Sequence, residues 1–225
     1  MKNLQKLLYC AICICFVACD TAEETIDPII PNPGASLATY KVTFNFNWNA
    51  EDFPLNYPSN AHFSKLIGWS HTPSNTFFKH GTIASTGIKN MAELGATQVL
   101  IDELNTKIEN NEGLESVIGT GLGSGIGEIS VDLLVNAENS AITLVTMLAP
   151  SPDWYVAAVA VNLLENGAFV EEKTIQATIF DAGTDSGENF SAANNPTMPK
   201  APIAITDYPA LANGLPIAIV KFKKQ

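Results

Sequence analysis

Hydrophobic and polar side chains alternate without interruption from Lys41 to Trp48, and this run constrains the fold more than any other feature of the sequence. Successive side chains of a β-strand point to opposite faces, so such alternation is typical of a strand with one buried face. The side chains predicted to be buried are Val42, Phe44, Phe46 and Trp48. We therefore expect a sheet that covers a hydrophobic core on one side.

Four further segments have strand patterns. Residues 141–148 and 154–164 are apolar and rich in β-branched side chains, residues 174–180 alternate, and residues 217–222 form a last apolar run after Pro216. Asn166-Gly167 lies between the second and third of these segments and is the dipeptide most typical of a two-residue hairpin turn. The sequence thus predicts that 154–164 and 174–180 pair as an antiparallel hairpin.

Only two segments repeat their apolar residues at helical spacing. One contains Ile88, Met91 and Leu94 and ends at Gly95, and the other runs over residues 100–108 before an Asn-rich break. Strands outnumber helices, and strands and helices do not alternate along the chain. The predicted fold class is therefore mainly β: an antiparallel β-sandwich with about two short helices.

The N-terminal segment has the features of an export signal. Lys2 and Lys6 precede an apolar run over residues 7–18, and all four cysteines of the chain lie within residues 1–19. The run is too short for a spanning helix, which needs roughly 20 apolar residues. Residues 16–19 resemble a bacterial lipobox, which predicts a signal peptide over residues 1–18 and lipid attachment at Cys19. The alternative is ordinary cleavage near Ala18, with Cys19 left as a free thiol.

Residues 19–37 are predicted to be a tether, and residues 38–225 the folded domain. The tether contains three prolines and the paired acids Glu23 and Glu24. Acids directly after the lipidated cysteine resemble a signal that sends some lipoproteins to the outer face of the outer membrane. We therefore expect an exported protein, anchored to the outer membrane or cell surface by its N-terminal lipid.

The charge of the chain excludes one class of partner. The formal net charge is −11, the sequence has no arginine, and its only lysine cluster is Lys221, Lys223 and Lys224. A chain with this balance cannot neutralise a phosphate backbone, so no nucleic-acid partner is expected. The same negative field attracts divalent cations.

Three aspartates are the candidate metal ligands. A two-residue turn at 166–167 would place Asp153 opposite Phe180, next to Asp181, and Asp185 follows one turn later. Paired strands lie only about 4.8 Å apart, so these anions would repel one another unless a cation lay between them. Oxygen ligands without nitrogen or sulfur favour calcium over zinc. The alternatives are solvated turn aspartates and, from Asp185-Ser186-Gly187, an aspartic protease loop.

Several ordered segments carry a family resemblance. They are residues 61–64, 66–68, 70–71, 149–154 and 181–187, supported by 42–48, 84–92, 170–172 and 215–218. Together they resemble the spondin N-terminal domain family, of the F-spondin and mindin type. The resemblance implies a calcium-binding β-sandwich used in extracellular adhesion, with ligands at Asp153, Asp181 and Asp185. The chain differs in its lipid anchor and in lacking cysteines within the domain.

The sequence thus predicts a surface-anchored calcium-binding lipoprotein for adhesion or recognition. Its partner would be an extracellular protein or a glycan, and no catalytic residue is assigned. Two alternatives stay open: a calcium-dependent hydrolase, which would need a reactive group in a concave site beside the metal, and a structural subunit of a surface assembly.

Overall fold

The computed structural model describes residues 37–225, so the predicted signal peptide, Cys19 and nearly all of the predicted tether lie outside the described residues. In chain order the elements are β1 (Leu37–Asn47), β2 (His62–Phe63), β3 (Ile67–His71), α1 (Thr86–Leu94), α2 (Gln98–Glu109), β4 (Gly113–Ile118), β5 (Ile126–Asn136), β6 (Ala141–Ala149), β7 (Trp154–Asn162), β8 (Leu164–Glu165), β9 (Ala168–Phe169), β10 (Glu172–Gln176), β11 (Thr178–Asp181), β12 (Ala204–Ile205) and β13 (Ala218–Lys224). Within residues 37–225, no helix has the length and apolar character needed to cross a membrane.

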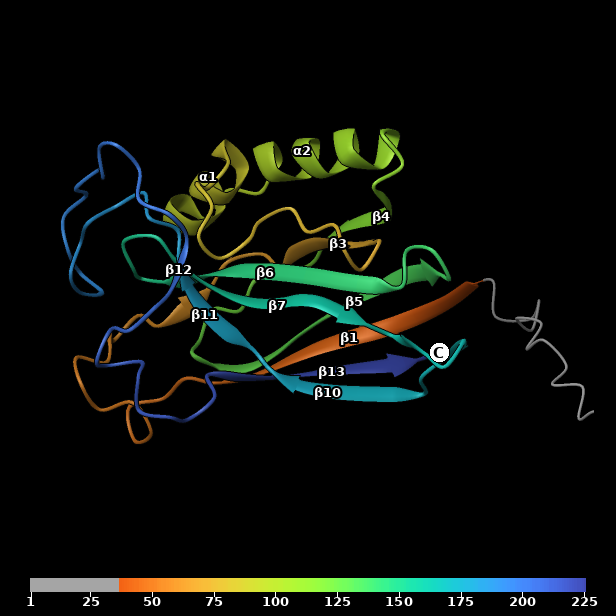
Figure 1. Ribbon diagram of the computed structural model, residues 1–225. Coiled ribbons are helices and arrows are strands. Elements are labelled where there is room, and N and C mark those ends of the chain that lie inside the picture. The colour runs from red at the N-terminus through yellow and green to blue at the C-terminus, as the bar shows by residue number, and fades with distance from the viewer. Residues whose placement is uncertain (1–36) are drawn as a thin grey trace, which may run out of the picture. The chain divides into compact units, whose positions relative to one another are not determined.

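The strands form two main antiparallel sheets, which confirms the predicted fold class. The smaller sheet has the order β10-β13-β1-β5, and the larger has the order β12-β11-β7-β6-β3-β4, with β2 paired to β6. Both helices lie over the larger sheet, on the side away from the smaller one (Figure 1). The domain over residues 37–225 therefore has three layers: the smaller sheet, the larger sheet and the helix pair.

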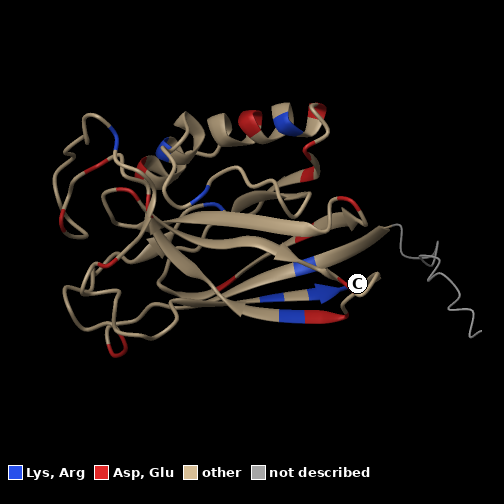
Figure 2. Ribbon diagram, viewed as in Figure 1, with Lys and Arg blue, Asp and Glu red and all other residues tan. Residues whose placement is uncertain are grey.

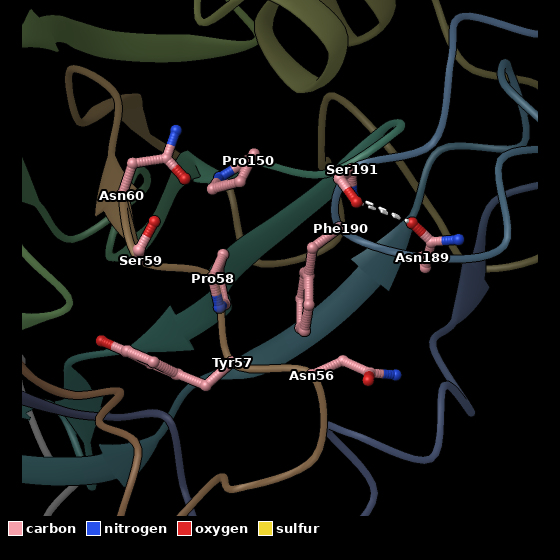
Figure 3. Close-up of a pocket in the computed structure, with 9 residues that line it drawn as sticks. All are labelled: Asn56, Tyr57, Pro58, Ser59, Asn60, Pro150, Asn189, Phe190 and Ser191. Atoms are coloured by element: carbon pink, nitrogen blue, oxygen red, sulfur yellow. Dashed lines mark hydrogen bonds between the residues drawn. The ribbon is translucent and has the colours of Figure 1, made fainter.

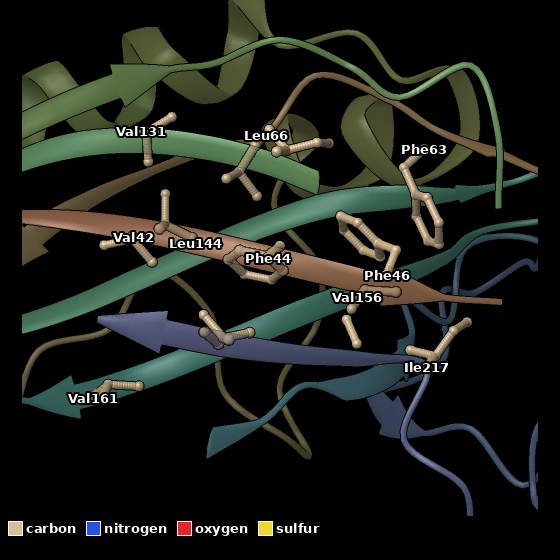
Figure 4. Packing of buried hydrophobic residues seen from close by; sticks show 14 of the residues in the cluster. Val42, Phe44, Phe46, Phe63, Leu66, Val131, Leu144, Val156, Val161 and Ile217 are labelled. Carbon is tan, nitrogen blue, oxygen red and sulfur yellow. The ribbon is translucent and has the colours of Figure 1, made fainter. Parts of the chain in front are cut away.

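The main core fills the space between the two sheets. β1 and Trp48, which directly follows it, contribute the alternating residues that were predicted to be buried, and each is at most 3% exposed. Phe46 stacks on Phe63 with 3.8 Å between ring centroids, and both belong to a cluster that includes Leu144 and Val156 of the larger sheet (Figure 4). Burial of such side chains stabilises the fold by about 1.5–3 kcal/mol each.

A second core lies between the larger sheet and the helices. Ile88 and Met91 of α1 are fully buried against sheet residues such as Trp69 and Tyr155. Ser85 caps α1 by accepting a hydrogen bond from the Ile88 N–H at 3.1 Å, as expected for a hydroxyl residue at this position. Both predicted helices are thus confirmed, although Leu94 is 72% exposed and contributes little to the core.

The predicted hairpin differs from the structure in the strands that the turn joins and in the course of segment 174–180. The turn at Asn166-Gly167 does join paired strands, but these are the short strands β8 and β9, in which Glu165 lies opposite Ala168. Segment 174–180 is two strands rather than one: β10 joins the smaller sheet, and β11 returns to pair with β7. Alternation alone could not reveal this change of sheet, because Ile175 and Ile179 pack against the same core from either sheet.

The lysine cluster near the C-terminus lies among acidic residues. Across the outer face of the smaller sheet, Glu172, Lys223, Lys41 and Asp132 follow one another on neighbouring strands. The Lys221 ammonium also lies 2.9 Å from the Glu172 carboxylate. Figure 2 shows lysine bands on neighbouring strands of this sheet, with acidic residues close to them. The face is therefore mixed in charge, and nucleic-acid binding remains unexpected on the sequence argument.

Candidate metal centre

Strand pairing brings two of the three candidate aspartates to the same end of the larger sheet. Trp154, the first residue of β7, lies opposite Asp181, the last residue of β11. Asp153 directly precedes Trp154, and its carbonyl oxygen accepts a hydrogen bond from the Ala182 N–H at 3.2 Å. The Trp154 indole N–H donates to the Asp181 carboxylate, also at 3.2 Å. The register is two residues from the predicted one, yet Asp153 and Asp181 remain neighbours.

Asp153 is the most unusual carboxylate among the described residues. Its side chain is 0% exposed. One oxygen, Oδ2, accepts hydrogen bonds from the Thr184 N–H at 2.6 Å, the Thr184 hydroxyl at 3.2 Å and the Asp185 N–H at 3.0 Å. The other oxygen, Oδ1, is buried and has no hydrogen-bond partner. A buried carboxylate oxygen without a partner is costly, so it requires a physical explanation.

Asp181 and Asp185 hold the turn that covers Asp153. Asp181 Oδ1 accepts a hydrogen bond from the Gly183 N–H at 2.7 Å, and Asp185 Oδ1 accepts one from the Gly187 N–H at 2.8 Å. Asp185 is 6% exposed, and its Oδ2 also accepts a bond from the Asn195 N–H at 2.9 Å. Both carboxylates therefore bond to backbone N–H groups, instead of sharing a proton as an aspartic protease pair would.

The electrostatics of this region are unfavourable without a counter-charge. Burial, and then the negative charge of Asp181, raise the pKa of Asp153 to about 6. Burial also raises the pKa of Asp181, with smaller contributions from Asp207 and Asp185. The ion pairs found within residues 37–225 all involve other carboxylates. The region thus concentrates negative charge that lysine does not compensate.

Asp207 is a contributor that sequence reasoning missed. It lies in the segment just after β12, which pairs with β11 and so approaches Asp181. The two residues of β12 are too few to give a readable strand pattern. No sequence signal therefore indicated that Asp207 belongs to this region.

The donor set fits a hard cation, although the three side chains do not form a ready-made cluster. In the described part of the chain, no group of three His, Cys, Asp or Glu side chains is close enough to hold a metal ion as it stands. The observation in favour of a cation is the Oδ1 of Asp153, which is buried without a partner in a carboxylate that also feels the negative charge of Asp181. Carboxylate and carbonyl oxygens are the ligands that calcium prefers. The assignment of calcium to Asp153, Asp181 and Asp185 stays a prediction.

Comparison with known proteins decides the family. The family model described as Spondin_N matches residues 38–210. This chain belongs to the spondin N-terminal domain family. It is similar to Spondin-2 of Rattus norvegicus, with 32% identity over 202 residues, which cover 83% of this chain and 61% of that protein. Spondin-2 of Homo sapiens is 31% identical over 169 residues, 73% of this chain and 51% of that protein.

Spondin-1 of Rattus norvegicus is also similar, with 32% identity over 203 residues, which cover 83% of this chain but only 25% of that protein. The chain therefore spans less than two thirds of the length of these curated relatives. The resemblance drawn from the sequence is confirmed at the level of the family. The segments 149–154 and 181–187, which carried the resemblance around Asp153 and Asp181, lie within residues 38–210 that the family model matches. Segment 215–218 lies beyond them.

The rim of this spondin domain also carries a cavity of about 550 Å³ (Figure 3). Its walls come from three loops, through residues Asn56, Tyr57, Pro58, Ser59, Asn60, Pro150, Asn189, Phe190 and Ser191. Pro150 is in the loop that leads to Asp153, and residues 189–191 follow Asp185. The loops of the candidate metal centre therefore also build part of the cavity.

Proposed function

We propose that this chain is an exported, lipid-anchored recognition protein whose spondin domain binds calcium through Asp153, Asp181 and Asp185. The observation that carries the calcium proposal is the Oδ1 atom of Asp153, which is buried without a partner in the described part of the chain. Family membership supports a role in extracellular adhesion or recognition. We assign no catalytic residue, and in the part of the chain that the structure describes no acidic or basic side chain lines the cavity near the aspartates.

The proposed ligands would act through oxygen atoms alone. Asp153 Oδ1, together with carboxylate oxygens of Asp181 and Asp185, would supply negative charge, and backbone carbonyl groups or water would complete a shell of roughly six to eight oxygens. A bound calcium ion would offset the mutual repulsion of these carboxylates. The loops that carry Asp153 and Asp185 would then be held together at the end of the sheet.

Calcium titration of the full-length protein tests this proposal. We expect one calcium ion per chain, measured by isothermal titration calorimetry, with a dissociation constant in about the 10⁻⁴ to 10⁻³ M range of extracellular calcium modules. Binding should disappear when a chelator is added. Magnesium should bind more weakly, because it demands a more regular octahedral shell. A calcium titration without heat or stabilisation would contradict the proposal.

The anchor part of the proposal rests on residues 16–19, which lie outside the described residues. Replacement of Cys19 by serine should prevent lipid attachment, because the acylated thiol is lost. The variant should then leave the detergent phase in a detergent-partitioning experiment, whereas wild type should remain in it. Cys15→Ser is the matched control and should partition as wild type does. If Cys19→Ser also stays in the detergent phase, the protein is not anchored through this cysteine.

Display at the outer membrane or cell surface, with an extracellular protein or glycan as partner, completes the proposal. It is supported by the resemblance of Glu23 and Glu24 to an export signal and by the family of the domain. The two sheets and the helices pack on one another, so the loops at one end of the sandwich are the part proposed to contact a partner. The cavity is at this end, together with the candidate metal centre.

A further inference from the structure

The cavity at the rim is lined by uncharged side chains, which is unusual in such an acidic protein. Three asparagines and two serines supply its polar groups, and Phe190, Tyr57 and two prolines supply its apolar surface. Among residues 37–225, no acidic or basic side chain lines it, although the chain has a net charge of −11. Its volume of about 550 Å³ lies within the range of small-molecule sites, roughly 300–1,000 Å³.

Several polar groups of the lining are free to bind a ligand. Within residues 37–225, the hydrogen bonds of the protein leave the Asn60 amide and the Ser59 hydroxyl uncommitted. Asn189 uses its oxygen to accept bonds from the Ser191 N–H and hydroxyl, at 3.0 and 3.2 Å, which leaves its NH₂ group available. An amide both donates and accepts, and so does a hydroxyl. Such groups match ligand hydroxyls, which also do both.

The apolar part of the lining is firmly anchored. Phe190 is 5% exposed, and its ring packs against Trp48, Trp154 and Tyr208 with centroid distances of 5.3–5.5 Å. Figure 3 shows Ser59 and Asn60 on one side of Pro58 and Pro150, with Phe190 and Ser191 on the other. An apolar surface between polar groups suits the alternating C–H and hydroxyl faces of a sugar ring.

Both walls of the cavity are preformed. Asn60 lies beside Pro150, because His62 of β2 pairs with Ala149 of β6. On the other wall, the loop that carries Phe190 is closed at its base by the bond from the Ser186 N–H to the Asn195 carbonyl, at 2.9 Å. The Asp185 carboxylate closes the same base through the Asn195 N–H. A preformed site loses little conformational entropy when it binds a ligand.

We propose that this cavity binds an uncharged sugar residue, with Ser59 and Asn60 as its hydrogen-bonding groups and the half-buried Tyr57 and Pro58 as its apolar surface. The proposal rests on the recognition role proposed above and names its site and ligand class. Neutral sugars fit better than anionic ones, because the neighbouring Asp153, Asp181 and Asp185 repel anions. A peptide fits less well, since the lining segments are loops rather than a free strand edge that could extend the sheet. Toward the sugar, Asp185 acts as a positioning residue, through its bond to the Asn195 N–H.

The test uses saturation-transfer NMR on the full-length protein with methyl glycosides of glucose, galactose, mannose and N-acetylglucosamine. At least one neutral glycoside should receive saturation, and glucuronic acid should receive none. Ser59→Ala combined with Asn60→Ala should weaken binding by about tenfold or more, because each lost hydrogen bond lowers affinity severalfold. Asn60→Asp should weaken it as well by adding a charge, and its melting temperature will show that the domain still folds.

The matched control removes one serine and one asparagine on the far side of the larger sheet. Ser116 donates to Asn105 at 2.7 Å on the exposed surface between α2 and β4. Ser116→Ala with Asn105→Ala should leave sugar binding unchanged. The proposal is overturned if no neutral glycoside binds, if binding survives the Ser59 and Asn60 changes, or if short peptides bind in place of sugars.

Calcium titrations on the same samples separate this proposal from the one on which it rests. Loss of sugar binding in the Ser59 and Asn60 variant, with the calcium heat unchanged, supports a distinct sugar site. Calcium binding without any sugar binding overturns the cavity proposal alone. Sugar binding without any calcium heat overturns the metal proposal alone.

Discussion

Asp153→Asn is expected to stabilise the calcium-free protein and to abolish its stabilisation by calcium. The pKa of Asp153 is raised to about 6, so keeping this carboxylate charged at pH 7 opposes folding. Removal of the charge should raise the free energy of unfolding by about 1–3 kcal/mol without calcium. In wild type, calcium at about 100 times its dissociation constant should add about 2.7 kcal/mol, and the variant should lose this gain. Thermal denaturation with calcium or with a chelator measures both effects.

The pH dependence of the same variant gives an independent readout. The folded-state pKa of Asp153 lies above the ordinary aspartate value, so the folded state binds a proton more readily than the unfolded state. Without calcium, the destabilising effect of Asp153 should therefore be complete above pH 6 and should fade as the pH drops towards 4. The stability difference between Asp153→Asn and wild type should shrink over that window. Asp132→Asn, on the exposed face of β5, is the control and should show neither effect.

Combining the three changes Asp153→Asn, Asp181→Asn and Asp185→Asn tests whether the ion is held by these residues at all. We expect no calcium-dependent shift in the melting temperature of this triple variant. A shift that survives would show that calcium binds elsewhere on the domain. Because Asp185 also closes the loop at Asn195, the triple variant should be compared with Asp153→Asn alone.

Gly68→Ala should cause the largest loss of stability among the changes considered. Gly68 lies in the middle of β3, between β4 and β6. An added methyl group would collide with the Thr143 carbonyl oxygen of β6 and would approach the Leu144 Cα to 2.8 Å. Both obstacles are backbone atoms, so rotation of a side chain cannot relieve the clash. We expect a loss of about 3 kcal/mol or more in the free energy of unfolding.

The backbone near Gly68 has little freedom to move. Thr143 lies at a bulge between β6 and β7, and its hydroxyl accepts a hydrogen bond from the Ala160 N–H at 2.8 Å. His71 also bonds to this hydroxyl at 2.8 Å through its Nε2 atom. Chemical denaturation measures the effect, and Gly123→Ala is the matched control, because its added methyl group meets no atom within 4 Å. Equal stability of the two variants would show that β3 and β6 can separate.

Local sequence patterns predicted most secondary structure because they depend on neighbours close in the chain. The alternation in β1 and the stop at Gly95 follow from this local chemistry. Gly95 adopts a φ of 64°, a conformation that glycine tolerates readily at a helix end. The same reasoning located Asp153 and Asp181 at one end of a strand pair, although their register was wrong by two residues.

The sequence by itself determined the fold class, the two helices, the three candidate aspartates and the family, because strand and helix periods and ordered motifs are properties of the chain. Only the tertiary structure decided that segment 174–180 changes sheets, since one apolar face meets the same core from either sheet. It alone showed that Asp153 is buried with a free oxygen, and that three distant loops enclose a cavity lined by amides and hydroxyls. Burial and enclosure depend on segments far apart in the chain, so no local pattern records them.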